Sequence, residues 1–352
     1  MAIGSWNSLP SEYTTRVSGQ RRTNEKFRPG FHQKNKKTMR NILILSTFLL
    51  LTKHLAAQQD PMFTRNTFNS MYLFNNPAYS GTHGYWTTNG LFRTQWVGFD
   101  GAPQTIYLGA EGMIGRKQNA GLGFSFFHDK IGLDRVTDLS ANYAYHIRLN
   151  DEQTFSIGIK AGAFFYKSLL GTAILTDNGD PIYSSGDVQG VVPRAGLGVY
   201  WYSADYFIGL SVPTLVAIDD RAGGFNFSPG NDGIQKAHYY GHFGYVFRLG
   251  NDIDLKPSIL LKYQPSAPLE ADFNLNVWFS DILAFGASYR TNDAVSVMVE
   301  VPIGKKLSIG YAFDHTITPI QNISSGTHEI MVGYNFVSDI RPVGVRRTPN
   351  RF

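Results

Sequence analysis

Hydrophobic and polar residues alternate strictly along several stretches of this chain. Between positions 136 and 149 one face carries apolar side chains and the other carries polar ones. The apolar face comprises Leu139, Ala141, Tyr143, Tyr145, Ile147 and Leu149, and the polar face comprises Asp138, Ser140, Asn142, His146 and Arg148. A period of two is typical of a β-strand that separates an apolar medium from a polar one.

The same alternation returns at 236–249, 270–280 and 293–302. Each stretch is about ten residues long, the length that a tilted strand needs to cross a bilayer. Extended along the whole chain, the pattern predicts fourteen strands, at 84–97, 104–114, 119–127, 136–149, 152–165, 193–202, 204–212, 236–249, 252–263, 270–280, 281–290, 293–302, 304–313 and 326–337. An even number suits a single-chain bacterial barrel. We therefore predict an all-β fold, a transmembrane antiparallel up-and-down β-barrel of about 14 strands.

The connections between these predicted strands differ in length. Tight turns are expected at Asn150-Asp151, Ser203, Gly250-Asn251, Ser280-Asp281 and Gly304-Lys305, and long loops at 166–192, 213–235, 264–269 and 314–325. Short periplasmic turns and longer extracellular loops are typical of outer-membrane barrels. A soluble β-sandwich also alternates and is the structural alternative. An aromatic cluster favours the barrel, since it would suit an interfacial girdle: Tyr200, Trp201, Tyr202, Tyr206 and Phe207.

The first part of the chain has the order of a secretory signal peptide. Basic residues precede the apolar run 42–51, and Leu55-Ala56-Ala57 then offers small residues before Gln58. The run is too short to span a membrane as a helix, which needs about 20 apolar residues. We expect a non-structural extension at 1–38, a cleavable signal peptide at 39–57, a periplasmic N-terminal segment or plug at 58–83, the outer-membrane barrel at 84–337 and a C-terminal tail at 338–352.

Composition narrows the possible functions. The chain has no cysteine, which excludes disulfides, thiolate metal sites and a lipid anchor on an N-terminal cysteine. Its formal charge of +5 comes from residues 1–57, which hold ten of the 32 basic residues and two of the 27 acidic ones. The remainder carries 22 basic and 25 acidic residues, so no nucleic-acid-binding surface is expected.

No constellation of residues indicates catalysis. Gly-x-Ser-x-Gly and phosphate-binding loops do not occur in the sequence. His238 and His242 share one strand face, but residues four apart on a strand are separated by about 13 Å, too far to hold one metal ion. We expect solvated lumen histidines there. The sequence therefore predicts a protein without enzymatic activity, cofactor or metal.

Several ordered motifs resemble the PorP/SprF family. They begin with Gln58-Gln59-Asp60-Pro61-Met62-Phe63 and Asn75-Asn76-Pro77-Ala78-Tyr79-Ser80-Gly81, followed by Arg93-Thr94-Gln95-Trp96-Val97-Gly98-Phe99-Asp100-Gly101-Ala102-Pro103. Further matches are Gly121-Leu122-Gly123, His128-Asp129-Lys130-Ile131-Gly132 and Tyr206 to Pro213. The resemblance runs from about Gln58 to Phe336. It implies an outer-membrane component of the type IX secretion system and gliding motility apparatus, with machine components and a secreted surface cargo protein as partners.

Two motifs are the candidate sites. Asp60, Pro61, Asn75, Asn76, Pro77, Ala78 and Tyr79 precede the first strand and form a candidate partner-binding or plug motif. Arg93, Gln95, Trp96, Gly98, Phe99, Gly101 and Pro103 form a family hairpin motif, in which glycine and proline supply turn geometry between two strands. The main alternative function is an outer-membrane transport channel for small solutes, and an outer-membrane enzyme is a weaker one.

Overall fold

Alternating residues form long antiparallel strands in the computed structural model, which describes residues 72–115, 117–172, 187–217, 237–250, 252–264, 267–280 and 282–336. The first strands are β1 (Trp86–Thr94), β2 (Gln104–Ile114), β3 (Ala120–Ile131), β4 (Asp134–Arg148), β5 (Thr154–Ser168), β6 (Val188–Tyr202) and β7 (Tyr206–Ala217). They are followed by β8 (Tyr239–Tyr245), β9 (Phe247–Leu249), β10 (Ile253–Tyr263), β11 (Glu270–Phe279), β12 (Leu283–Arg290), β13 (Ala294–Ile303), β14 (Leu307–Thr316) and β15 (Thr327–Phe336).

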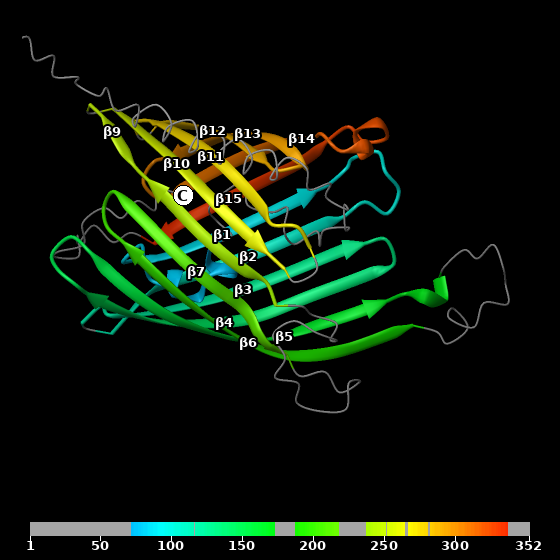
Figure 1. The fold of residues 1–352 in the computed structure, drawn as a ribbon, viewed down its shortest axis with the longest axis horizontal. Helices are drawn as coiled ribbons and strands as arrows, with labels where there is room; N and C mark the ends of the chain where they lie inside the picture. The colour runs from blue at the N-terminus through cyan, green and yellow to red at the C-terminus, as the bar shows by residue number, and fades with distance from the viewer. Residues whose placement is uncertain are drawn as a thin grey trace, which may run out of the picture. The chain divides into compact units, whose positions relative to one another are not determined.

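The strands close into a barrel in which neighbours in sequence are neighbours in space (Figure 1). The last strand, β15, pairs with β1, and Trp86 lies opposite Phe336. The pairing of β10 with β11 completes the ring. Both β8 and β9 pair with β10, so they are two parts of one strand interrupted at Val246. The barrel therefore has fourteen strands, which confirms the predicted fold class and up-and-down order.

Connections at the two ends of the barrel differ, although less regularly than expected. At one end, here called the turn end, short turns join β4 to β5, β6 to β7, β11 to β12 and β13 to β14. The opposite loop end carries the longest connections, 169–187 and 218–238. Two loop-end connections, 132–133 and 291–293, are also short. Strand β6 begins earlier and β7 ends later than predicted, so both loops next to them are shorter than expected.

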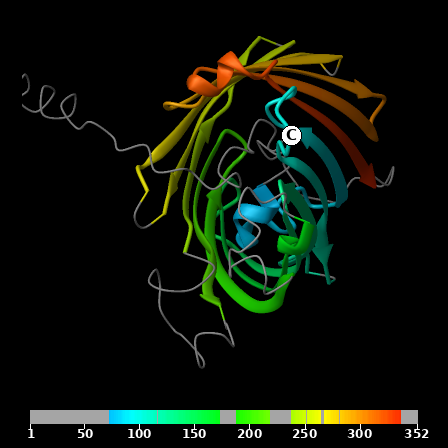
Figure 2. The same cartoon turned by 90° about the vertical axis from the view of Figure 1, so that its right-hand side faces the viewer.

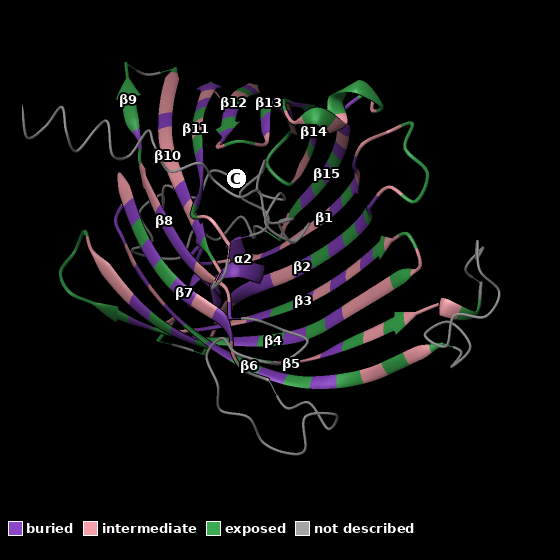
Figure 3. Cartoon of the chain, turned by 45° about the vertical axis from the view of Figure 1, so that its right-hand side comes forward, coloured by how far each residue is buried: buried purple, intermediate pink, exposed green. Residues whose placement is uncertain are grey.

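Buried and exposed residues alternate along many of the strands (Figure 3), and the two faces of the wall differ in polarity. Leucine, isoleucine, valine and aromatic side chains point outward, and many remain half exposed, as at Leu139 and Ile159 with 47% and 54% of their surface accessible. Polar and charged residues point inward and are buried, including Asp138, Asn142 and Lys160. An apolar exterior around a polar interior is the arrangement of a lipid-embedded barrel. No helix of the described residues is long and apolar enough to cross a membrane.

Short helices accompany the strands. They are α2 (Tyr72–Asn75), η3 (Pro77–Tyr79), η4 (Leu170–Thr172) and η6 (Pro319–Asn322). The first two lie inside the ring of strands (Figure 2), where η3 contacts β4, β5 and β6. Residues 72–84, here called the plug, thus occupy the lumen just before β1 begins. The expected extension, signal peptide and C-terminal tail, together with Asp60 and Pro61, lie outside the described residues.

The expected aromatic girdle is wrong for three of its five residues. Tyr200, Tyr202 and Phe207 point into the lumen and are 1%, 6% and 1% exposed. Their neighbours Trp201 and Tyr206 are half-buried, and their rings lie 5.5 Å apart. Because strand side chains alternate, adjacent aromatics on one strand divide between the two faces.

Candidate partner-binding site

Side chains of the barrel wall hold the plug by its backbone. Ser211 Oγ donates to Asn75 O at 2.7 Å, Ser156 Oγ donates to Ala78 O at 2.8 Å, and Lys160 Nζ donates to Phe74 O at 3.1 Å. Buried backbone carbonyls need such partners, because an unpaired polar group away from water is costly. The inward polar side chains of β5 and β7 therefore supply hydrogen-bond donors to the buried carbonyl groups of the plug.

Asn76 organises the centre of the plug. Its side-chain oxygen accepts a hydrogen bond from Ala78 N at 3.0 Å and so caps η3, whose first residue is Pro77. Its side-chain nitrogen donates to Val199 O on β6 at 3.1 Å. Asparagine is among the preferred helix N-caps, and proline is favoured at the first helical position. The structure thus brings the candidate residues Asn75 to Tyr79 together, and it buries all five of them.

Replacing Asn76 with alanine is expected to destabilise the folded barrel by about 0.5–2 kcal/mol, since the cap and the bond to β6 are both lost. Urea unfolding of the purified barrel, followed by tryptophan fluorescence, measures this change. Asn150→Ala is the matched control, because Asn150 also accepts backbone hydrogen bonds but lies exposed in a turn. Equal unfolding midpoints for the two variants would contradict the assigned role of Asn76.

An aromatic cluster fixes the plug against β6 and β7. The Tyr79 ring lies 5.6 Å from Tyr72 and 5.7 Å from Tyr200, in edge-to-face geometry. Phe207 lies 5.9 Å from both Tyr72 and Tyr200. Burial raises the pKa of Tyr72 and that of Tyr79 above the ordinary value of a tyrosine, so both phenols stay neutral. This cluster makes one of the apolar cores within the lumen.

Histidines of the wall and of the plug itself take part in holding the plug. His146 Nε2 lies 2.8 Å from Ser80 O, and its Nδ1 lies 3.1 Å from the Tyr202 hydroxyl. His83 and Gly81 both contact the carboxylate of Glu111. His242, 1% exposed, packs its ring 4.7 Å from Tyr72. The expectation of a solvated lumen histidine is therefore wrong for His242, which is buried against the plug.

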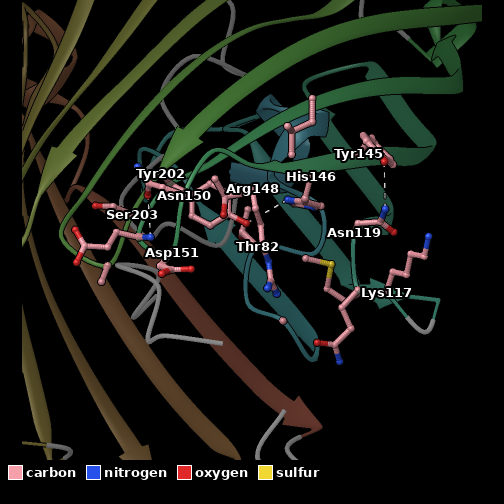
Figure 4. A pocket seen from close by; sticks show the side chains of 17 residues that line it. Thr82, Lys117, Asn119, Tyr145, His146, Arg148, Asn150, Asp151, Tyr202 and Ser203 are labelled. Atoms are coloured by element: carbon pink, nitrogen blue, oxygen red, sulfur yellow. Dashed lines mark hydrogen bonds between the residues drawn. The ribbon is translucent and has the colours of Figure 1, made fainter. Parts of the chain in front are cut away.

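A cavity of about 670 Å³ opens below the plug at the turn end (Figure 4). Thr82 of the plug lines it together with residues of the turns after β2, β4 and β6. Lys117 and Arg148 supply exposed cations, and Asp151 and Glu152 supply exposed carboxylates. His146 and Tyr202 form its wall toward the plug. A mixed polar and apolar cavity built by turns is suited to binding part of another protein.

The hairpin motif lies at the loop end and is anchored by Arg93. Its guanidinium, 1% exposed, lies 2.6 Å from Asp314 on β14 and 3.0 Å from Glu329 on β15. The ionic cluster continues through Arg290, which lies 3.5 Å from Asp314 and 3.4 Å from Asp272. Other members are Lys262, Glu270 and Asp293. The cluster connects β10, β11, β12, β14, β15 and β1 inside the barrel.

The rest of the motif forms the connection between β1 and β2. Gly98 and Gly101 adopt positive φ angles of 98° and 76°, and Trp96 also lies in the left-handed region at 46°. The predicted turn role of the glycines agrees with these angles. Backbone hydrogen bonds join Gln95 N to Pro103 O at 2.9 Å and Val97 N to Gly326 O at 2.9 Å. Phe99 remains 44% exposed, while Gln95 is buried.

Sequence reasoning did not identify the residues that hold the plug. In the sequence these residues are only polar positions on a strand face, and no neighbouring residue links them to residues 72–84. They are Glu111, Ser156, Lys160 and Ser211. The one feature that could have indicated them is a polar residue at a strand position that faces the lumen. Among the residues that the structure describes, no group of three His, Cys, Asp or Glu side chains is arranged to hold a metal ion.

Comparison with known proteins identifies a family. Residues 55–334 match the model of a family described as type IX secretion system membrane protein PorP/SprF. Among curated protein sequences, none matches the chain.

Several solved structures are similar to this chain at low sequence identity. Omp33, an outer membrane protein of Acinetobacter baumannii, is 8% identical with a TM-score of 0.40, covering 73% of this chain and 100% of its own. The toluene transporter TodX of Pseudomonas putida is 9% identical with a TM-score of 0.43, covering 75% and 93%. A Pseudomonas aeruginosa FadL homologue is 9% identical with a TM-score of 0.41, also covering 75% and 93%. These similarities concern the fold alone.

Proposed function

Because this chain belongs to the PorP/SprF family of type IX secretion system membrane proteins, we propose that it acts in that system by binding other proteins. It is an outer-membrane β-barrel component of the secretion apparatus. The finer proposal is that the turn-end cavity binds a periplasmic component of the machinery and that the loop end meets a secreted surface cargo protein. Short turns face the periplasm in barrels of this kind, which supports the orientation.

The make-up of the turn-end cavity is the observation that carries this proposal. Four exposed charged residues, Lys117, Arg148, Asp151 and Glu152, line the cavity together with the half-buried Met113. Buried apolar contact with a charged rim is the usual anatomy of a protein interface. The plug supports the cavity wall, because His146, which lines the cavity, contacts Ser80 of the plug. In this proposal the buried motif Asn75 to Tyr79 shapes the binding surface rather than touching the partner.

The position of the plug favours binding over solute transport. Tyr72 to Gly84 occupy the lumen beside β2 to β7, and Tyr79, Ala78 and Phe74 are each at most 4% exposed. A solute would have to displace this packed segment, with its hydrogen bonds and aromatic contacts. We therefore prefer a protein-binding barrel to the channel alternative.

Reversing both cations of the cavity, Lys117→Glu with Arg148→Glu, is expected to reduce copurification of type IX secretion proteins by at least about tenfold, the effect of roughly 1.4 kcal/mol. Quantitative mass spectrometry of the tagged barrel from outer membranes measures it, together with cargo secretion. Lys130→Glu is the matched control, since Lys130 is exposed at the loop end. Undiminished copurification, at normal barrel abundance, would refute the cavity as the binding site.

A further inference from the structure

Three cations form one transverse row on the outer surface of the barrel at the loop end. Strands β3, β4 and β5 run side by side (Figure 3), with Lys130 opposite Arg135 and Arg135 opposite Lys167. Residues directly opposite each other in antiparallel strands point to the same face. That face is the outer one, because Asp129, next to Lys130, is buried on the lumen side. Two glutamines extend this cation row: Gln104 on β2 and Gln189 on β6.

The positive charge of the cation row is only partly compensated. Lys130 and Lys167 are exposed, and Arg135 is half-buried. Among the described residues, one carboxylate pairs with the row, that of Asp187 at 3.4 Å from the Lys167 ammonium. Asp134 precedes Arg135 and so directs its side chain to the opposite face of β4. Elsewhere at the loop end, the described strands carry no outward Lys or Arg, so the row is a local concentration of charge.

The cation row lies just beyond the apolar belt of the outer wall. Along β4 and the start of the turn after it, outward apolar residues run from Leu139 to Leu149. About ten residues cover about 34 Å along a strand, or about 26 Å across the membrane at a tilt of about 40°. The apolar band of outer-membrane barrels is about 25 Å tall. Arg135 therefore lies at the level of the lipid headgroups, where basic side chains keep their charge in a polar layer.

An apolar groove of about 930 Å³ lies on the same outer surface, nearer the turn end than the cation row. Phe126 and Leu139 line it and lie opposite each other on β3 and β4, four positions from the cations of those strands. Ala141 and Ala161, opposite each other on β4 and β5, also line it, and both are exposed. Their short side chains leave space beside the larger ones. A groove at this level of the wall faces lipid hydrocarbon.

We infer that the cation row and the groove together bind a phosphorylated lipid of the outer leaflet, with its phosphate groups on the cations and its acyl chains along the groove. Ammonium and guanidinium groups bind phosphate through charge-assisted hydrogen bonds. A lipid uses both parts of the surface, whereas an acidic protein segment would use the cations alone. The inference goes beyond the proposed function and takes from it only the orientation that places the loop end outside.

Lipid binding to the purified barrel in detergent tests the inference, with bisphosphoryl lipid A as the probe and native mass spectrometry as the measurement. The unmodified barrel is expected to bind it at least about tenfold more tightly than dephosphorylated lipid A, because cations near the headgroups attract phosphate. Lys130→Gln with Lys167→Gln should remove most of this preference. Arg135 is retained, since its Nη1 donates to two backbone carbonyl oxygens at the β3–β4 turn.

Lys305→Gln with Lys306→Gln is the matched control, because these two lysines are exposed in the β13–β14 turn at the opposite end of the barrel. It should keep the preference for phosphorylated lipid. Ala141→Trp fills the groove without changing charge and is expected to weaken the binding of both lipids by at least about threefold, since less apolar surface of the acyl chains is buried.

Four results would each overturn the inference: equal binding of the two lipids, inorganic phosphate that binds as tightly as lipid A, unchanged binding by Lys130→Gln with Lys167→Gln, or unchanged binding by Ala141→Trp. If the two lipids bind equally and the lysine variant loses a copurified protein, the cation row serves an acidic protein segment instead.

The lipid inference and the proposed function can fail separately, because the turn-end cavity includes no residue of the cation row or the groove. Lys130→Gln with Lys167→Gln should therefore keep the copurification of type IX secretion proteins. Lys117→Glu with Arg148→Glu should keep the preference for phosphorylated lipid A. Loss of lipid selectivity in the unmodified barrel would reject only the lipid site, and undiminished copurification in the cavity variant would reject only the cavity.

Discussion

Replacing Arg93 with methionine is expected to destabilise the barrel by about 3–5 kcal/mol, because it leaves two buried carboxylates without their main cation. Arg93 is 1% exposed and lies 2.6 Å from Asp314 and 3.0 Å from Glu329. Methionine preserves most of the apolar stem but removes the charge. Urea unfolding of the purified barrel measures the loss, and barrel abundance in outer membranes should fall with it.

The matched control is Arg248→Met. Arg248 also forms an ion pair, with Asp205, but the two side chains are 47% and 44% exposed. Exposed ion pairs contribute only about 0–1 kcal/mol, since water and salt screen them. Adding Glu329→Gln to Arg93→Met should restore part of the lost stability by removing one uncompensated charge. Equal destabilisation by Arg93→Met and Arg248→Met would show that the cluster does not hold the strands together.

Replacing Gly158 with leucine is expected to displace the plug and open the lumen. A Cβ at Gly158 would overlap the backbone of Pro77 and Ala78, and backbone cannot rotate away as a flexible side chain can. Overpacking of this kind costs about 1–3 kcal/mol or more, which favours release of the segment over distortion of a strand paired on both sides. Planar-bilayer recording is expected to show steady conductance for Gly158→Leu and little for the unmodified barrel.

Thiol labelling gives a second readout of plug position. The chain has no cysteine, and Ser80 is 0% exposed, so Ser80→Cys introduces one buried thiol. It is expected to resist a water-soluble maleimide in the otherwise unmodified barrel and to react at least about tenfold faster once Gly158→Leu is added, since buried thiols are poorly accessible. Ala161→Leu is the control, because Ala161 lies exposed on the same strand. If the Gly158→Leu barrel shows no conductance and its Ser80→Cys thiol stays unreactive, the plug tolerates the added side chain.

Most of the wall could be predicted from the sequence. Period-two alternation located every strand, and the predicted bounds agree closely for β2, at 104–114, and β10, at 252–263 against Ile253–Tyr263. The reason is that each strand must separate lipid from lumen along its whole length. The alternation of apolar and polar residues is therefore present within every strand. The end of β7 was less predictable, because a bulge places Pro213, Thr214 and Leu215 opposite the single residue Gly196 and so breaks the alternation.

The candidate site was predictable only in part. Asn75 to Tyr79 stood out because they precede the first strand and resemble a family motif, but their burial against Ser156 and Ser211 depends on which wall residues face them. Arg93 was identified within the hairpin motif, whereas its partners Asp314 and Glu329 lie more than two hundred positions away. Contacts of this kind require the register of closure between β15 and β1.

The sequence by itself determined the fold class, the number of strands, the apolar outer face and the family, since each depends on patterns within single segments. Only the tertiary structure decided where the segment before the first strand lies, which polar wall residues hold it and which buried charges pair. Those features arise from barrel closure and strand register, which bring together residues distant in sequence. A local pattern shows that a side chain faces inward, but not which residue it meets there.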